Sequence, residues 1–131
     1  MNATPLQARS LSPNITASDL PRSIKFYTDG LGFEIVHRHE EDGVLRYVML
    51  KGGGALLSLG MDDFAKGRDR SKGVGLRLWI NTTQDINVLA EQAKRAGITL
   101  DEGPAALPWG PMAFAVTDPD GFKVTVANER E

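Results

Sequence analysis

The feature that most constrains the fold of this chain is an internal repeat with a spacing of about 65 residues. Residues 11–33 have the pattern of a short strand, a helix and the start of a further strand, and residues 74–98 repeat that order. Ile24 and Gly32 have their counterparts 65 positions later, at Leu89 and Gly97. In a chain of 131 residues, two such units leave room only for small modules that share one core.

Each unit contains a helix with a recognisable beginning. Ser18 and Asp19 are good N-cap residues, and apolar residues then recur at spacings of 4, 3 and 4 up to Leu31. In the second unit a stripe of apolar residues starts at Ile86 and ends near Gly97, which is typical of a helix C-terminus. The spacing predicts helices over 20–31 and 86–96.

Each unit ends in a predicted hairpin. The first has strands at 46–50 and 55–59 joined by three glycines, and the second has strands at 112–117 and 122–126 joined by Asp118-Pro119-Asp120-Gly121. The chain is therefore predicted to be a single α+β domain, residues 1–131. It consists of two βαβββ modules, at 9–62 and 73–129, with a polar linker at 63–72 between them.

Composition excludes several classes of protein. The net charge is -2, from 15 basic and 17 acidic residues, and no long basic run is present, so we expect neither nucleic acid nor a membrane as partner. There is no cysteine, hence no disulfide and no thiolate metal site. The first residues lack a secretory pattern, and we expect a soluble cytoplasmic protein.

Strand alternation predicts which side chains point away from the helices, toward a cleft. Pairing across the turns places Tyr47 opposite Ser58 and Phe114 opposite Thr125, so each module offers an aromatic ring beside a hydroxyl. Met49 alternates with Tyr47 and is expected on the same wall of the cleft. The opening strands are expected to add four more residues to this side, namely Ser12, Asn14, Leu76 and Leu78.

The two tryptophans have different predicted environments. Trp109 lies between Pro108 and Gly110, in a loop that holds the ring near the surface. Two interpretations stay open for Trp109: the ring plugs one end of the sheet, or it stacks on a flat ligand at the rim of the cleft. Trp79 alternates away from Leu78, and we expect it to pack in the core under the second helix. Lys123 is a further candidate anchor for a ligand.

The histidines do not predict a metal site. His37 and His39 share one side of a strand, but a metal would need two further ligands, and Glu41 is the only candidate nearby. We interpret this pair as a polar strand end.

Several motifs together resemble one known family. They are the segments Ala17-Ser18-Asp19-Leu20-Pro21-Arg22-Ser23-Ile24-Lys25-Phe26-Tyr27, Leu31-Gly32-Phe33 and Asp118-Pro119-Asp120-Gly121-Phe122. In this order they resemble the vicinal oxygen chelate superfamily, which includes glyoxalase I, extradiol dioxygenases, and the fosfomycin-resistance and bleomycin-resistance proteins. Pro108-Trp109-Gly110 resembles the bleomycin-resistance branch. The resemblance implies a curled, barrel-like sheet around a cleft, helices on the outside, and a homodimer.

The resemblance also gives the positions where metal-dependent relatives hold their ligands. These positions are Ser12, Ser58, Leu76 (or Leu78) and Thr125, and none is a histidine, glutamate or glutamine. Hydroxyls and a leucine are not a ligand set for a catalytic cation. We therefore expect no metal, no other cofactor and no catalytic residue.

The function we expect is a metal-free small-molecule binding protein, similar to bleomycin-resistance proteins, that sequesters a hydrophobic or planar ligand and so confers antibiotic resistance. The alternative is an atypical lyase, isomerase or oxygenase of the same superfamily. A third hypothesis is a dimeric interaction module with a vestigial cleft. The candidate ligand-binding residues are Ser12, Asn14, Tyr47, Met49, Ser58, Trp109, Phe114 and Thr125.

Overall fold

A computed structural model describes residues 4–68 and 70–129. Within these ranges the first module contains β1 (Asn14–Ala17), α1 (Leu20–Lys25), the π-helical segment η1 (Phe26–Gly30), β2 (Glu34–Glu41), β3 (Val44–Gly52) and β4 (Ala55–Met61). The second module contains β5 (Arg77–Thr82), α2 (Ile86–Arg95), β6 (Glu102–Ala106), β7 (Met112–Thr117) and β8 (Lys123–Asn128).

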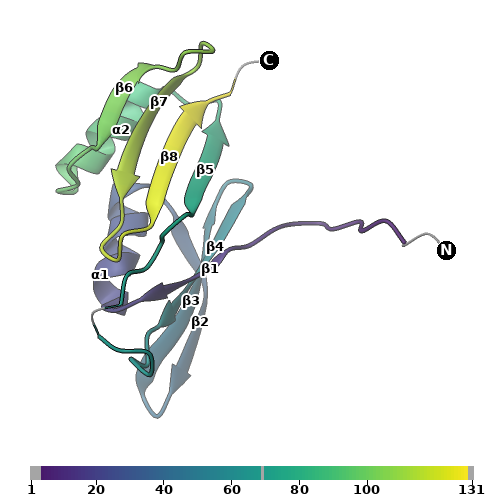
Figure 1. The fold of residues 1–131 in the computed structure, drawn as a ribbon, viewed down its shortest axis with the longest axis vertical. Helices are drawn as coiled ribbons and strands as arrows, with labels where there is room; N and C mark the ends of the chain where they lie inside the picture. The colour runs from purple at the N-terminus through teal and green to yellow at the C-terminus, as the bar shows by residue number, and fades with distance from the viewer. Residues whose placement is uncertain (1–3, 69, 130–131) are drawn as a thin grey trace.

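The two modules have the same sheet topology. The strand orders are β1-β4-β3-β2 and β5-β8-β7-β6, and in each sheet the opening strand pairs in parallel with the closing strand (Figure 1). This arrangement confirms the predicted α+β class and the duplicated βαβββ order. The sheets are curled, but they do not close into a barrel.

Both predicted helices are present and begin at acidic caps. The carboxylate of Asp19 accepts a hydrogen bond from the backbone N–H of Arg22 at 3.2 Å, and Asp85 accepts one from Asn87 at 2.9 Å. The N-cap of the second helix is thus Asp85, two residues after the Thr82-Thr83 pair at which the preceding strand was expected to end. Pro21 lies in the first turn of α1, where a backbone N–H would have no hydrogen-bond acceptor within the helix, so the missing N–H of proline costs nothing.

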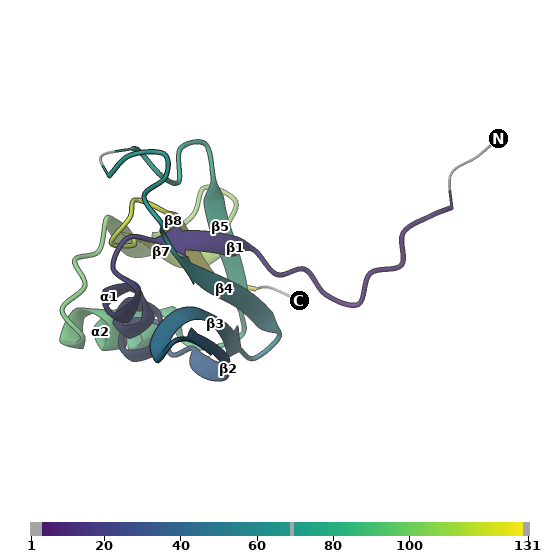
Figure 2. The ribbon, with the colours of Figure 1, turned by 90° about the horizontal axis from the view of Figure 1, so that it is seen from below.

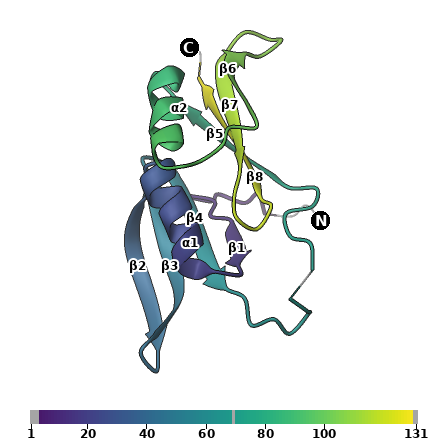
Figure 3. The same cartoon turned by 90° about the vertical axis from the view of Figure 1, so that its left-hand side faces the viewer.

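One core joins the two modules. Buried side chains on one side of each sheet pack with α1, η1 and α2, among them Leu50, Leu59, Val116, Val124 and Ala90. The helices lie one above the other in Figure 3, and Figure 2 shows them on the same side of the molecule. The opposite side of each sheet, which we call its open face, is left uncovered by these helices. Residues 4–13 leave the body as an extended arm (Figure 2).

A buried hydrogen bond ties the helix of the first module to the last turn of the second. The Tyr27 hydroxyl donates to Asp118 Oδ2 at 2.7 Å, and Tyr27 is 0% exposed. Asp118 also accepts from the backbone N–H groups of Asp120 at 2.8 Å and Phe122 at 2.9 Å. Burial raises the pKa of the Asp118 carboxyl, and these hydrogen bonds oppose that rise. Burial beside Asp118 also raises the pKa of the Tyr27 phenol, which stays a donor.

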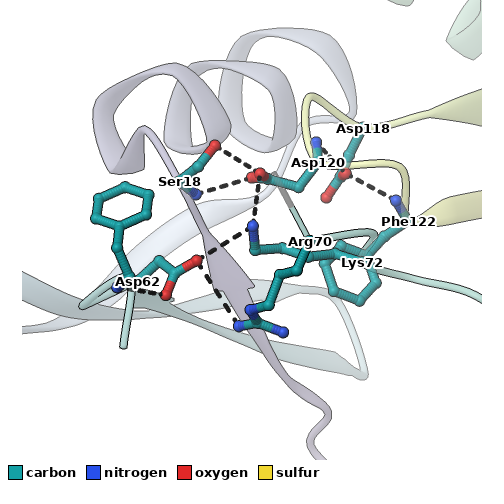
Figure 4. A network of polar contacts seen from close by, with 8 residues as sticks. Ser18, Asp62, Arg70, Lys72, Asp118, Asp120 and Phe122 are labelled. Carbon is teal, nitrogen blue, oxygen red and sulfur yellow. Dashed lines mark hydrogen bonds and ion pairs between the residues drawn. The ribbon is translucent and has the colours of Figure 1, made fainter. Parts of the chain in front are cut away.

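The same turn holds the linker through a group of charges (Figure 4). Asp120 accepts from the hydroxyl of Ser18 at 2.6 Å and from its backbone N–H at 3.0 Å. Lys72 Nζ lies 3.1 Å from Asp62 Oδ2 and 3.9 Å from Asp120 Oδ1. A hydrogen bond from the N–H of Phe64, together with Lys72, lowers the pKa of Asp62. The turn at 118–121 therefore fastens the two modules together.

Candidate functional site

The open face of the second sheet combines three exposed side chains with two small buried ones. Arg77 and Trp79 alternate along β5, and the parallel register pairs them with Lys123 and Thr125 of β8. Thr125 is in turn opposite Ala115 of β7. These five residues lie on one side of the sheet because partners in a register point the same way and alternate residues share a side.

The guanidinium of Arg77 is oriented by a single hydrogen bond. Its Nη1 donates to Thr125 Oγ1 at 2.8 Å, and Thr125 is only 5% exposed. An arginine has five N–H donors, so most of them remain available. In the part of the chain that the structure describes, Arg77 has no ion-pair partner.

Two stacked indoles lie on this side of the molecule. The rings of Trp79 and Trp109 have centroids 6.2 Å apart and an interplanar angle of 27°. The indole N–H of Trp79 donates to Asn81 Oδ1 at 3.0 Å, which fixes the plane of that ring. Trp79 is 44% exposed and Trp109 is 67% exposed, so the pair presents aromatic surface to solvent. Trp109 is not a buried plug.

A cavity of about 260 Å³ lies on the same face of the second sheet. It is lined by Pro108, which precedes Trp109 in the chain, and by Thr125, the register partner of Trp79, but neither indole is itself a lining residue. Arg77 and Thr125 stand at one side, Glu102 belongs to β6 at the other, and the small side chains of Ala113 and Ala115 lie between. Its remaining lining residues are Gly103, Ala105, Ala106, Leu107 and Phe114. A second, open cavity of about 460 Å³ borders Arg77 on its other side and is lined mostly by the residues of 72–77.

The open face of the first sheet is different in character. Asn14 pairs with Ser58, and Ser58 pairs with Met49. The hydroxyls of Tyr47 and Ser58 are 2.8 Å apart and hydrogen-bonded, and the rings of His37 and Tyr47 meet edge to face at 6.4 Å. The groups that meet on this face are hydroxyls, an amide, a thioether and an imidazole.

The predicted site residues are therefore divided between two surfaces. Asn14, Tyr47, Met49 and Ser58 lie on the first sheet, and none of them lines the cavity of the second. Thr125 lines that cavity, whereas Trp109 is not a lining residue and follows the lining residue Pro108 in the chain. The remaining predicted residue of the first module, Ser12, precedes β1; its hydroxyl is buried and has no hydrogen-bond partner within the described ranges.

The predicted pairing of Phe114 with Thr125 is wrong. Phe114 pairs with Val126, and it is Ala115 that pairs with Thr125. The turn contains five residues, 118–122, so the register differs by one from the expected pairing, and a slip of one residue moves a side chain to the opposite side of a sheet. Phe114 is 2% exposed and belongs to the hydrophobic core.

The expected pairing of Tyr47 with Ser58 is also wrong, by two residues. Tyr47 pairs with Gly60, and Met49 pairs with Ser58, because only Gly53 and Gly54 form the loop. A slip of two residues keeps the side, so the Tyr47 and Ser58 side chains still meet.

The alternation predicted for β5 is inverted. Leu78 pairs with Val124 and packs against the core, and Leu76 precedes the strand, so neither is the partner of Thr125. Trp79 is that partner, and its predicted place under the second helix is wrong. Arg77 and Trp79 are the residues that sequence reasoning missed. The repeat could have identified Trp79, because the spacing of 65 residues makes it the counterpart of Asn14, which was expected on the open face.

The structure offers no obvious centre for a cation. Among the described residues, no group of three or more His, Cys, Asp or Glu side chains is placed to hold a metal ion. The described part of the chain also has no helix that is long and apolar enough to cross a membrane.

This geometry defines a class of small α+β proteins, in which a duplicated βαβββ module places a ligand-sized cavity on an open sheet face. The family model of the Glyoxalase/Bleomycin resistance protein/Dioxygenase superfamily matches residues 9–126. The chain therefore belongs to this superfamily. None of the curated proteins matches the chain.

Solved structures share the fold of this chain. A member of the superfamily from Sphaerobacter thermophilus is 29% identical, with a TM-score of 0.71 over 94% of this chain and 98% of that one. TnmS3, an antibiotic binding protein from Streptomyces sp. CB03234, is 22% identical, with a TM-score of 0.71 over 97% and 100%. A lactoylglutathione lyase from Agrobacterium tumefaciens is 19% identical, with a TM-score of 0.68 over 95% and 96%. The last two likenesses show a common fold.

Proposed function

We propose that this chain is a metal-free, cytoplasmic small-molecule binding protein that sequesters a planar ligand against the open face of its second sheet. The observation that carries the proposal is the exposed indole pair of Trp79 and Trp109 beside a cavity of about 260 Å³. Ligand pockets commonly measure roughly 300–1,000 Å³, so this cavity suits a small molecule of one or two rings. The likeness to the antibiotic binding protein TnmS3 agrees with a binding function.

The chemistry of the open faces supports binding without a metal. The side chains that occupy the centres of the two faces are hydroxyls, an amide, an arginine and an indole: Asn14, Ser58, Arg77, Trp79 and Thr125. Such groups orient and stack a ligand but are poor ligands for a divalent cation.

A homodimer is the second part of the proposal. The open faces of the two sheets lie outside the shared core, and the expected site residues are divided between them: Asn14, Tyr47, Met49 and Ser58 lie on the first, and Thr125 lies on the second. The arm at 4–13 adds exposed apolar surface, because Leu6 is 89% exposed and Leu11 is 87% exposed. A second copy would cover such surface and bring a first-sheet face against a second-sheet face.

Intrinsic fluorescence tests the binding function directly. The chain has two tryptophans, both in the indole pair, so any change in emission reports on this face. We expect a panel of small planar aromatic compounds to quench this emission saturably. Trp109→Ala should weaken binding about 10-fold, since a buried aromatic contact contributes roughly 1–3 kcal/mol.

The matched control is Val88→Ala, which truncates a side chain that is 58% exposed on the outer helix α2. It should leave the affinity unchanged. Linear, non-saturating quenching by every compound of the panel would refute ligand binding at this face. Elemental analysis of the purified protein and light scattering at micromolar concentration test the metal-free state and the dimer.

A further inference from the structure

The open face of the second sheet carries two adjacent positive charges that form no ion pair with a described residue. Arg77 and Lys123 are direct partners in the parallel register of β5 and β8. Like charges directly opposite one another in a sheet are destabilising. Lys123 Nζ lies 3.5 Å from the hydroxyl of Thr117, which itself donates to the carboxylate of Asp101. No carboxylate of the described residues forms an ion pair with either cation.

The arginine of this pair is held ready for a ligand. Its bond to Thr125 fixes one edge of the guanidinium, and Thr125 is 5% exposed, so the bond rests on a buried anchor. A guanidinium with free donors in a rigid plane matches the two oxygens of a carboxylate. The charge therefore sits at a defined place at the side of the cavity.

The floor of the cavity fits a flat ring. Ala113 and Ala115 are the β7 residues on this face, and a methyl group is the largest projection that either makes. Thr125, Ala115 and Glu102 stand in one line across three neighbouring strands, which spans about two strand spacings of roughly 4.8 Å each. A two-ring aromatic compound has a comparable length.

We propose that this site selects planar aromatic acids: the carboxylate pairs with Arg77, the ring lies over Ala113 and Ala115, and its edge meets the indole pair. This inference rests on the proposed binding function and further specifies that the ligand carries a negative charge. Glu102 lines the far side of the cavity, where it disfavours a ligand with a second negative charge.

The test compares two ligands of the same shape, naphthalene-2-carboxylate and the neutral naphthalene-2-carboxamide, by quenching of tryptophan emission. The wild-type protein should bind the acid about 10- to 100-fold more tightly than the amide, as expected for charge-assisted hydrogen bonds. Arg77→Met should abolish this preference, because it weakens binding of the acid far more than binding of the amide, which loses only a neutral acceptor's hydrogen bond. Added salt should reduce the preference in the wild type.

Two variants guard against indirect effects. Arg77→Lys keeps the charge but not the planar fork, so it should retain part of the preference. Arg95→Met removes the same charge from the exposed last turn of α2, on the covered side of the sheet, and should retain all of it.

The outcomes separate the two proposals. Equal affinity for acid and amide in the wild type, or a preference that survives Arg77→Met, overturns the selection of acids but leaves a binding protein. Failure of both naphthalene probes and of the wider panel to bind saturably overturns both proposals.

Discussion

Replacing Tyr27 by Phe tests whether the buried bond to Asp118 fastens the two modules. The change removes one hydroxyl from a ring that is 0% exposed and leaves the ring's packing intact. The carboxylate of Asp118 then keeps only its two backbone donors. A hydrogen bond to a charged group contributes about 1.5–3 kcal/mol, so the free energy of unfolding at neutral pH should fall by that amount. For a chain of this length the melting temperature should drop by roughly 5–12 °C.

The effect should depend on pH in a defined direction. Burial already raises the pKa of Asp118, and the Tyr27 bond opposes that rise, so the pKa in the folded variant lies still higher. A carboxyl with a raised folded pKa favours folding at low pH, and this benefit is lost as pH rises through that pKa. The variant therefore recovers stability relative to the wild type as pH falls toward about 4.

The measurement is urea unfolding followed by far-ultraviolet circular dichroism at neutral pH and near pH 4. Tyr47→Phe is the matched control, because its hydroxyl bonds the neutral Ser58 on an open face. It should cost about 1 kcal/mol or less at both pH values. A loss for Tyr27→Phe below about 0.5 kcal/mol, or an equal loss at both pH values, refutes the argument.

Three further predictions follow from the same contacts. Phe114→Ala should lower the free energy of unfolding by about 3–5 kcal/mol, as a core truncation does, and selective loss of ligand binding in a fully stable protein would contradict the core assignment. Asp120→Asn should cost about 1–2 kcal/mol by weakening the bonds from Ser18, and unchanged urea midpoints would show that this contact is dispensable. Ser58→Ala should weaken binding of naphthalene-2-carboxylate by no more than about fivefold, because a neutral hydrogen bond contributes about 1 kcal/mol; a larger loss would show that this hydroxyl dominates binding.

The sequence predicted the architecture well because the repeat, the helix stripes and the turn residues all point to the same modules. Elements formed by local interactions begin where the sequence predicts, as α1 does after Asp19, although a π-helical segment occupies residues 26–30 of the helix predicted over 20–31. The curled sheets of the α+β fold were also expected, although not their failure to close into a barrel.

The site was less predictable because strand register depends on turn length, which the residue types alone did not fix. The loop of Gly53 and Gly54 has two residues, whereas the turn at 118–122 has five. The first prediction was wrong by two residues, so the side chains stayed on the predicted face of the sheet. The second was wrong by one residue, so Ala115 and not Phe114 lies on the open face. Arg77 and Trp79 were missed for a similar reason, since the alternation of β5 was counted from Leu76.

The two hairpin turns occupy equivalent places in the repeat but are not interchangeable. The turn at 118–121 reaches Tyr27 and Ser18 of the first module, whereas the glycine turn at 52–54 has no side chain with which to return such a bond. The two modules therefore have the same strand order, but among the described residues the side-chain hydrogen bonds between them come from the turn of the second module. A chain with the two hairpins exchanged would keep the parallel and antiparallel pairing of its strands. It would nevertheless lose the hydrogen bonds that join the turn at 118–121 to the first module, so the position of each hairpin in the chain contributes to stability.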